Sequence, residues 1–245
     1  MSLNQILSFL AAIIMFVFAA YVLQRYVTRR KLHFLFWGTG LAMFAIASLS
    51  GALLSIGWSD VFFFTWYYFG ALVTAAWIGQ GTVYLLMRKK WAHILAAILI
   101  AASIVAAIML LRVMPDLDTS AYTTSESIGE QYRDIMPPID EGGYVRLATP
   151  FFNVYGLVTL VGGALWSSYL FWRKRILPNR VIGNILIAGG ALVIASAGLL
   201  TRVGLGSVLY FGELAAAIMM FSGFLIAAAP RPVSGSEKQS PAPVA

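Results

Sequence analysis

The chain has 245 residues, of which 60% are hydrophobic and 11% are charged, and its mean hydropathy is +0.82. A water-soluble domain of this length needs far more charge to keep its surface solvated, so the composition indicates a polytopic membrane protein. The absence of cysteine excludes disulfides, thiolate chemistry and cysteine-ligated metal sites. The formal charge of +7 lies in short clusters between apolar blocks, which is a topology signal and excludes a nucleic-acid-binding face.

Seven apolar blocks are each long enough to cross about 30 Å of hydrocarbon at about 1.5 Å per residue. The predicted spans are residues 3–23, 32–56, 61–87, 92–111, 150–172, 181–201 and 206–229. The predicted fold is therefore all-α, a seven-helix transmembrane bundle over residues 1–229. The first span should remain as a helix, because no positive charges precede it as they do in a cleaved signal peptide. Residues 230–245 are rich in Pro and Ser, which predicts a disordered cytoplasmic tail.

Basic residues divide unevenly between the two ends of the predicted spans. Of 17 Lys and Arg residues, 13 fall in the loops after spans one, three and five and in the tail. The other four are Arg112, Arg133, Arg146 and Arg202. Loops rich in Lys and Arg stay in the cytoplasm, so the predicted orientation is N-terminus outside and C-terminus inside, in the cell membrane.

One connection is long, the predicted outer loop at residues 112–149. It carries seven acidic residues, and Ile128, Tyr132 and Ile135 recur at helical spacing. A Thr123-x-x-Glu126 capping signal precedes them and Pro137-Pro138 follows, which predicts a short amphipathic helix on the outer face. A solvated loop and a lid over a ligand are the alternatives.

Spans three and seven share a triplet near the outer end, Tyr68-Phe69-Gly70 and Tyr210-Phe211-Gly212. Spans two and six share "AIASLSGALL" and "VIASAGLL", and an Arg/Lys cluster follows both span one and span five. These likenesses favour a parallel 3+1+3 repeat, with spans 1–3 and 5–7 as units and span four as a linker. Helices rich in Ala, Gly and Ile also resemble one another by composition alone.

This plan resembles the broad group that contains microbial rhodopsins and PQ-loop sugar carriers. The first three spans, with Arg29-Arg30-Lys31 and then Phe69-Gly70, also resemble the seven-span sensor regions of bacterial histidine kinases. The departures are that no lysine lies in span seven, where a rhodopsin binds retinal, and that no paired Pro-Gln motif occurs. The resemblance therefore implies a plan and carries over no functional residue.

The sequence predicts no enzymatic activity and no cofactor. It has no H-E-x-x-H and no Gly-x-Ser-x-Gly motif, and no pair of Asp residues lies inside a span. Its two histidines, His33 and His93, begin spans two and four at the predicted inner interface, which does not suit haem or metal binding. Five tryptophans near span ends fit an interfacial belt: Trp37, Trp58, Trp66, Trp91 and Trp172.

Glu213 is the only acidic residue inside a predicted span, about seven residues from its outer end. A charge at the bilayer centre costs about 2.5–3.5 kcal/mol on insertion scales, so the site must pair or neutralise it. Two interpretations follow: a structural clasp with Arg202, or a protonatable site coupled to a ligand. The candidate ligand-binding residues are Glu213, Arg202, Trp77, Gln80, Tyr84, Asn153 and Trp166. Close packing of small and polar residues between helices would produce the same stripes.

Three functions remain open from the sequence. The leading one is a receptor or sensor-like bundle that binds a small or lipidic ligand and acts through a membrane or cytoplasmic protein partner. The second is a small-solute transporter with a proton-sensitive site at Glu213. The third is an accessory or scaffold subunit of a membrane complex. A polar cavity that reaches Glu213 would favour the transporter.

Overall fold

The structure, a computed structural model, describes residues 3–175 and 177–229, apart from the side chain of Arg202. All regular structure in these residues is helical, and seven helical spans are long and apolar enough to cross a membrane. The first two are α1 (Leu3–Arg29) and α2 (Leu32–Leu54), and the fourth is α5 (Lys89–Val113). The sixth and seventh are α9 (Pro178–Leu200) and α10 (Ser207–Ala228). The predicted tail, residues 230–245, lies outside the described residues.

The third and fifth spans each contain a stretch of π-helix. The third consists of α3 (Asp60–Thr65), the π-helix η1 (Trp66–Val73) and α4 (Thr74–Leu86). The fifth consists of α7 (Val145–Leu157), the π-helix η5 (Val158–Gly162) and α8 (Gly163–Arg173). The triplet at 68–70 therefore lies in π-helix, whereas the triplet at 210–212 lies in regular α-helix.

Two spans were predicted too short. The first span continues to Arg29 instead of ending at residue 23, because the Arg25 guanidinium lies over the Tyr21 and Phe224 rings and extends the packed face. The fifth span begins at Val145 instead of residue 150, and Pro150 lies inside it. A proline in the second turn removes a single backbone hydrogen bond, and the helix continues through it.

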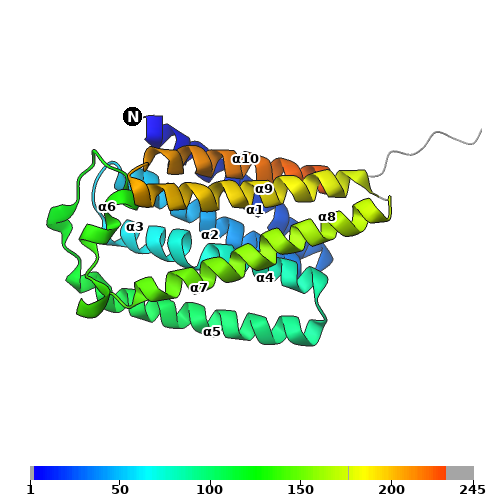
Figure 1. Cartoon of the computed structure of the whole chain (residues 1–245), viewed down its shortest axis with the longest axis horizontal. Coiled ribbons are helices and arrows are strands. Elements are labelled where there is room, and N and C mark those ends of the chain that lie inside the picture. The colour runs from blue at the N-terminus through cyan, green and yellow to red at the C-terminus, as the bar shows by residue number, and fades with distance from the viewer. Residues whose placement is uncertain (1–2, 176, 230–245) are drawn as a thin grey trace, which may run out of the picture.

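Six of the seven spans form a ring, and α5 lies outside it (Figure 1). Around the ring, α1 contacts α2, α2 contacts α4, and α4 contacts α7 and η5; α8 then contacts α9, α9 contacts α10, and α10 returns to α1. The helix α5 packs outside, against α4 and α7. The fourth span is therefore peripheral to two three-helix groups.

Small residues bring the ring helices close together. A Cβ added to Gly183 of α9 would meet backbone atoms of Gly223 and Ala227 on α10. A Cβ added to Gly156 of α7 would meet the backbone of Ala75 on α4. In a membrane, dispersion contacts between closely packed helices replace the hydrophobic effect, so such contacts hold the bundle together.

The segment between α5 and α7 covers one end of the bundle, and we call residues 114–144 the cap (Figure 1). It contains the 3₁₀ turns η2 (Met114–Asp116), η3 (Thr119–Ala121) and η4 (Ile139–Glu141) and the helix α6 (Ile128–Ile135). The predicted amphipathic helix is confirmed, with Ile128 and Ile135 buried. The predicted capping signal at Thr123 was wrong, because the helix begins after Ser127, whose hydroxyl donates to Glu130.

Hydrogen bonds fix the cap to itself and to the spans. The Gln131 side chain accepts from the Thr123 amide at 2.7 Å and donates to the Thr123 and Glu126 carbonyls. The Tyr122 hydroxyl donates to the Leu54 carbonyl of α2, and burial raises its pKa. Hydrogen bonds from Ser120 lower the pKa of the Asp118 carboxyl. The cap is therefore an ordered structure in which most of the described buried polar groups form hydrogen bonds.

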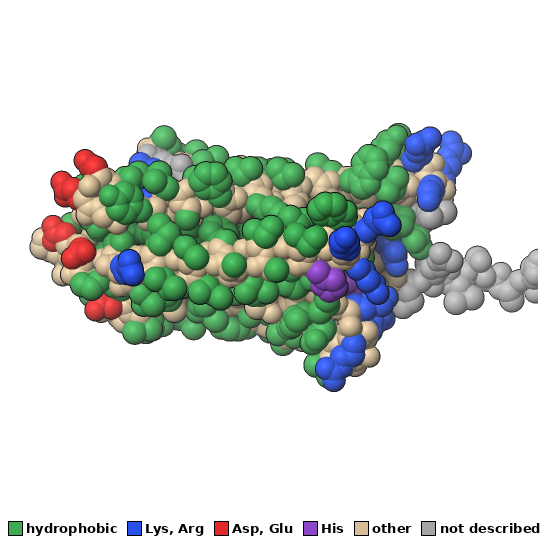
Figure 2. Space-filling view, turned by 90° about the horizontal axis from the view of Figure 1, so that it is seen from below, with side chains coloured by type: hydrophobic (Ala, Val, Ile, Leu, Met, Phe, Trp, Pro, Cys, Tyr) green, Lys and Arg blue, Asp and Glu red, His purple; other side chains and the backbone are tan. Residues whose placement is uncertain are grey.

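The surface between the two ends is apolar. Figure 2 shows hydrophobic side chains covering the sides of the bundle, with Asp and Glu at the end that carries the cap and most Lys and Arg at the opposite end. Many large apolar side chains are exposed on this belt, among them Ile13, Ile98, Val158 and Leu199. A belt of this kind suits hydrocarbon instead of water, and the chain is a multi-pass membrane protein.

Candidate functional site

Glu213 lies inside the bundle, beneath the cap. It is the seventh residue of α10 and its side chain is 8% exposed. The Ser8 hydroxyl of α1 lies 3.5 Å from one carboxylate oxygen, and Ser48 of α2 also lies close enough to act on the carboxylate. The helices α1, α2 and α10 therefore each contribute a side-chain oxygen group to one buried site.

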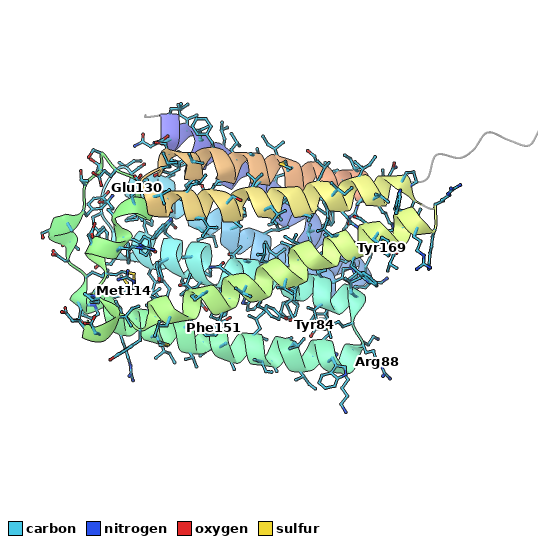
Figure 3. All side chains as sticks on the ribbon, in the orientation of Figure 1. Tyr84, Arg88, Met114, Glu130, Phe151 and Tyr169 are labelled. Carbon is cyan, nitrogen blue, oxygen red and sulfur yellow. The ribbon has the colours of Figure 1, made fainter. Side chains whose placement is uncertain are left out.

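The cap touches this place through Tyr210, one turn before Glu213. Tyr210 is 4% exposed and lies near Ser127 and Glu130 of the cap. Glu130, labelled in Figure 3 at the covered end, accepts a hydrogen bond from the Gly206 amide at 2.6 Å. The cap thus holds the turn before α10.

The predicted clasp between Arg202 and Glu213 has no counterpart in the described side chains. Arg202 lies in the 3₁₀ turn η6 (Thr201–Val203), and its side chain lies outside what the structure describes. Among the described side chains, the Ser8 hydroxyl is the group that contacts the Glu213 carboxylate at hydrogen-bond distance, and the Ser48 hydroxyl lies nearby without a hydrogen bond of normal geometry.

Gln80 belongs to a second polar place, where α4, α5 and α7 meet. It is fully buried, its amide donates to the Ala92 carbonyl of α5 at 2.9 Å, and it accepts from the Tyr155 hydroxyl of α7. This network uses the polar atoms of Gln80 to hold α5 and α7 against α4. Its position at a helix junction indicates packing instead of ligand binding.

Trp77, Tyr84 and Asn153 lie along the same junction. The Trp77 indole donates to Ser103 of α5 at 3.1 Å, and the Tyr84 hydroxyl lies 3.0 Å from His93 of α5. Asn153 of α7 donates to the Ala71 carbonyl at 2.9 Å. In Figure 3, Tyr84 lies between the ribbons of α4 and α5, far along the bundle from Glu130.

Trp166 lies elsewhere, on the outer face of α8. It is 56% exposed and packs against Tyr169, which in turn packs against Trp172. The structure therefore places the predicted site residues in three separate regions. Trp77, Gln80, Tyr84 and Asn153 lie together, whereas Glu213 and Trp166 each lie apart from them.

The ring encloses a cavity of about 60 Å³ on its axis. All six ring spans line it, and α5 does not. Its walls are mainly apolar: Phe18, Val22, Trp37, Leu41, Ile78, Leu160, Met220 and Phe224 are among them. We call it the central cavity. Glu213 is not among its lining residues.

Polar atoms border the central cavity at a few points. The Trp37 indole donates to Thr82 at 3.3 Å, and Ser167 and Asn184 also line the cavity. Trp37 was predicted in an interfacial belt, but its indole faces α4 inside the ring. The sequence prediction missed these residues because they are mostly apolar among other apolar residues. A signal that could have indicated the cavity is the presence of hydrogen-bonding residues at matching depths in three spans: Trp37, Thr82 and Asn184.

Part of the wall of the central cavity also lies at the surface of the bundle. Leu85 and Leu86 of α4 line it and are 50% and 41% exposed, so they belong to the cavity and to the surface.

The chain was compared with protein-family profiles, with curated proteins and with solved structures, and none of them matches.

Proposed function

We propose that this protein is a receptor-like seven-helix bundle that binds the end of a slender apolar chain, such as a lipid tail, in its central cavity. The observation that carries this proposal is an apolar cavity on the ring axis, lined by all six ring spans, with Leu85 and Leu86 of its wall also exposed on the apolar surface. An occupant there contacts every ring helix at once. Binding of the occupant can therefore shift the packing of the ring helices, and this change can alter the binding of a protein partner at the basic end.

The size and chemistry of the cavity define the ligand class. A cavity of about 150 Å³ lined by apolar side chains holds benzene. At about 60 Å³ the central cavity suits a few methylene or methyl groups instead of a ring. The Trp37–Thr82 pair satisfies its own hydrogen bond, and most of the other lining residues are apolar, so the cavity suits an apolar ligand better than a strongly polar one.

The charge distribution supports an orientation for this receptor. Lys and Arg gather at the end opposite the cap, so that end faces the cytoplasm, with α1 beginning outside and α10 ending inside (Figure 2). The membrane would be the cell membrane. The peripheral position of α5 supports a 3+1+3 repeat, in which α1 to α4 and α7 to α10 are equivalent groups around the cavity.

A transporter is the second candidate, because the central cavity lies between these two three-span groups. Transport requires the cavity to open alternately to both ends of the bundle. A transporter would move a solute into sealed vesicles, whereas a receptor would bind its ligand and leave the vesicle interior unchanged.

The test is the thermal unfolding midpoint of the purified protein in the presence of straight-chain alkyl ligands of increasing length. A ligand that binds the folded state raises the midpoint in proportion to the logarithm of its concentration. We expect stabilisation by straight-chain ligands and none by bulky ring ligands.

A matched pair of variants locates the effect. Ala164 is 7% exposed and lines the cavity, so Ala164→Leu fills it and should abolish the stabilisation. Ala195→Leu adds the same bulk to an exposed position on α9 and should preserve it. Equal responses from both variants would contradict binding in the central cavity.

A further inference from the structure

Glu213 carries a buried carboxylate whose charge the described residues do not balance. It is 8% exposed, and its described partners, Ser8 and Ser48, are neutral. The positive end of α10 does not supply the missing charge, because the effect of a helix terminus fades within the first turn and Glu213 lies in the second. A buried charge without a partner is strongly unfavourable, so the carboxylate needs either a bound cation or a proton.

Ser48 gives an independent indication of a missing occupant. Its side chain is 1% exposed and its hydroxyl makes no hydrogen bond of normal geometry among the described residues, although it lies near the Glu213 carboxylate. A buried hydroxyl without a partner is rare, since it loses its bonds to water and gains none. Ser48 therefore presents a free oxygen to the same place as Ser8 and Glu213.

The spacing of these oxygens suits a shared cation. The Ser8 hydroxyl and the Glu213 carboxylate are 3.5 Å apart, which is long for an O–H···O hydrogen bond, normally about 2.5–3.0 Å. Oxygen ligands lie about 2.3–2.6 Å from a cation of the size of calcium, and Na⁺ is nearly the same size. Two such ligands at right angles are about 3.3–3.7 Å apart.

The charge count selects a monovalent ion. The carboxylate carries one negative charge and the two hydroxyls carry none, so the three groups together neutralise a single positive charge. A divalent ion would leave one positive charge uncompensated inside the bundle. Among the described side chains, the other titratable groups that face this place are Tyr210 on α10 itself and, beyond it, Glu130 and Tyr122 of the cap; the side chain of Arg202, in the turn before α10, lies outside them. The α1 and α2 faces contribute the serine hydroxyls.

We propose that Glu213, Ser8 and Ser48 form a sodium site between α1, α2 and α10, and that a proton competes for the same carboxylate. Sodium would join three ring helices directly beneath the cap. This inference is independent of the proposed ligand, because none of the three residues lines the central cavity.

The test is the thermal unfolding midpoint of the full-length protein in detergent, measured against Na⁺ at constant ionic strength with choline as the replacement. At mildly alkaline pH, we expect the midpoint to rise by several degrees with the logarithm of the Na⁺ concentration. Acidification should raise the midpoint in the absence of Na⁺ and reduce the effect of added Na⁺, because protons then occupy the carboxylate.

Substitutions at the site should remove this response. Glu213→Gln should make the midpoint independent of Na⁺. Ser48→Ala removes one ligand and should move the response to roughly ten- to a hundredfold higher Na⁺. If Glu213→Gln does not fold, the response of wild type and of Ser48→Ala decides the matter.

Two controls match these variants. Thr74→Val removes the other buried hydroxyl that lacks a partner among the described residues, and Glu126→Gln removes an exposed carboxylate; both should retain the response to Na⁺. A wild-type midpoint that ignores Na⁺ would overturn the proposal, even if it varies with pH, since the carboxyl would then take only a proton. A Glu213→Gln variant that still responds to Na⁺ would also overturn it.

Discussion

Gly183 shows how single residues set the spacing of the bundle. A Cβ at this position would lie 2.6 Å from the Ala227 Cβ and 2.8 Å from the Ala227 amide nitrogen. These atoms belong to the neighbouring helix and can move away only if α9 and α10 separate. The glycine is therefore required by the close approach of the two helices, and its flexibility is incidental.

We expect Gly183→Leu to destabilise the protein by about 1–3 kcal/mol, as overpacking does elsewhere. The thermal unfolding midpoint should fall by about 2–10 °C for a chain of this size. Gly198→Leu is the control, because it lies on the same helix and no atom lies within 4 Å of its added Cβ. Equal losses from both variants would mean that helix propensity, and not the α9–α10 contact, explains the effect.

The cap illustrates how one element is fixed by one residue. Gln131 is 3% exposed and makes three hydrogen bonds within the cap, to the Thr123 amide and to the Thr123 and Glu126 carbonyls. Below it, the Tyr132 ring packs between Trp66 and Tyr67 of the third span. Polar bonds shape the cap, and aromatic contacts attach it to the bundle.

Gln131→Ala should loosen the cap without unfolding the spans. Each lost hydrogen bond contributes about 0.5–1.5 kcal/mol, so the cap should be cleaved by added protease about tenfold faster or more. The measurement is limited proteolysis, with the cut sites mapped by mass spectrometry. Arg133→Gln, on the exposed face of α6, is the control and should be cleaved at the wild-type rate. Cuts that appear first within the spans would show that Gln131 supports the whole fold.

The orientation of the whole molecule can be measured directly, because the chain contains no cysteine. Ser125→Cys places a thiol in the exposed part of the cap, and Lys90→Cys places one in the exposed first turn of α5, at the basic end. In intact cells, a membrane-impermeant maleimide should label Ser125→Cys at once and Lys90→Cys only after the membrane is made permeable. The reverse pattern would place the N-terminus inside.

The fold was more predictable from sequence than the sites. Length and hydropathy alone locate seven spans, since hydrocarbon demands about 20 apolar residues per helix. Because every face of such a helix is apolar, the residue types do not show which face points inward. Leu41 lines the central cavity and is 2% exposed, whereas Leu165, also a leucine, is 48% exposed. In a water-soluble protein, an exposed position such as that of Leu165 is usually occupied by a polar residue.

Polar residues misled for a related reason. Gln80 and Asn153 are buried or joined to a neighbouring helix because unsatisfied polar groups are costly in hydrocarbon, so they mark helix contacts as readily as ligand sites. Glu213 stood out correctly as a buried acid, but Ser8 and Ser48, which face it, are ordinary small residues in sequence. Only the packing of α1 and α2 against α10 brings these oxygens together.

The proposed function requires the end of an apolar chain to occupy the cavity on the ring axis. The most direct measurement is photo-crosslinking with a fatty acid that carries a diazirine at its terminal carbon, followed by mass spectrometry of the labelled peptides. We expect labels on cavity residues such as Phe18, Leu41 and Met220, and we expect Ala164→Leu to lose these labels. Labels confined to the exposed belt, at residues such as Ile13 and Val158, and unchanged in Ala164→Leu, would contradict it.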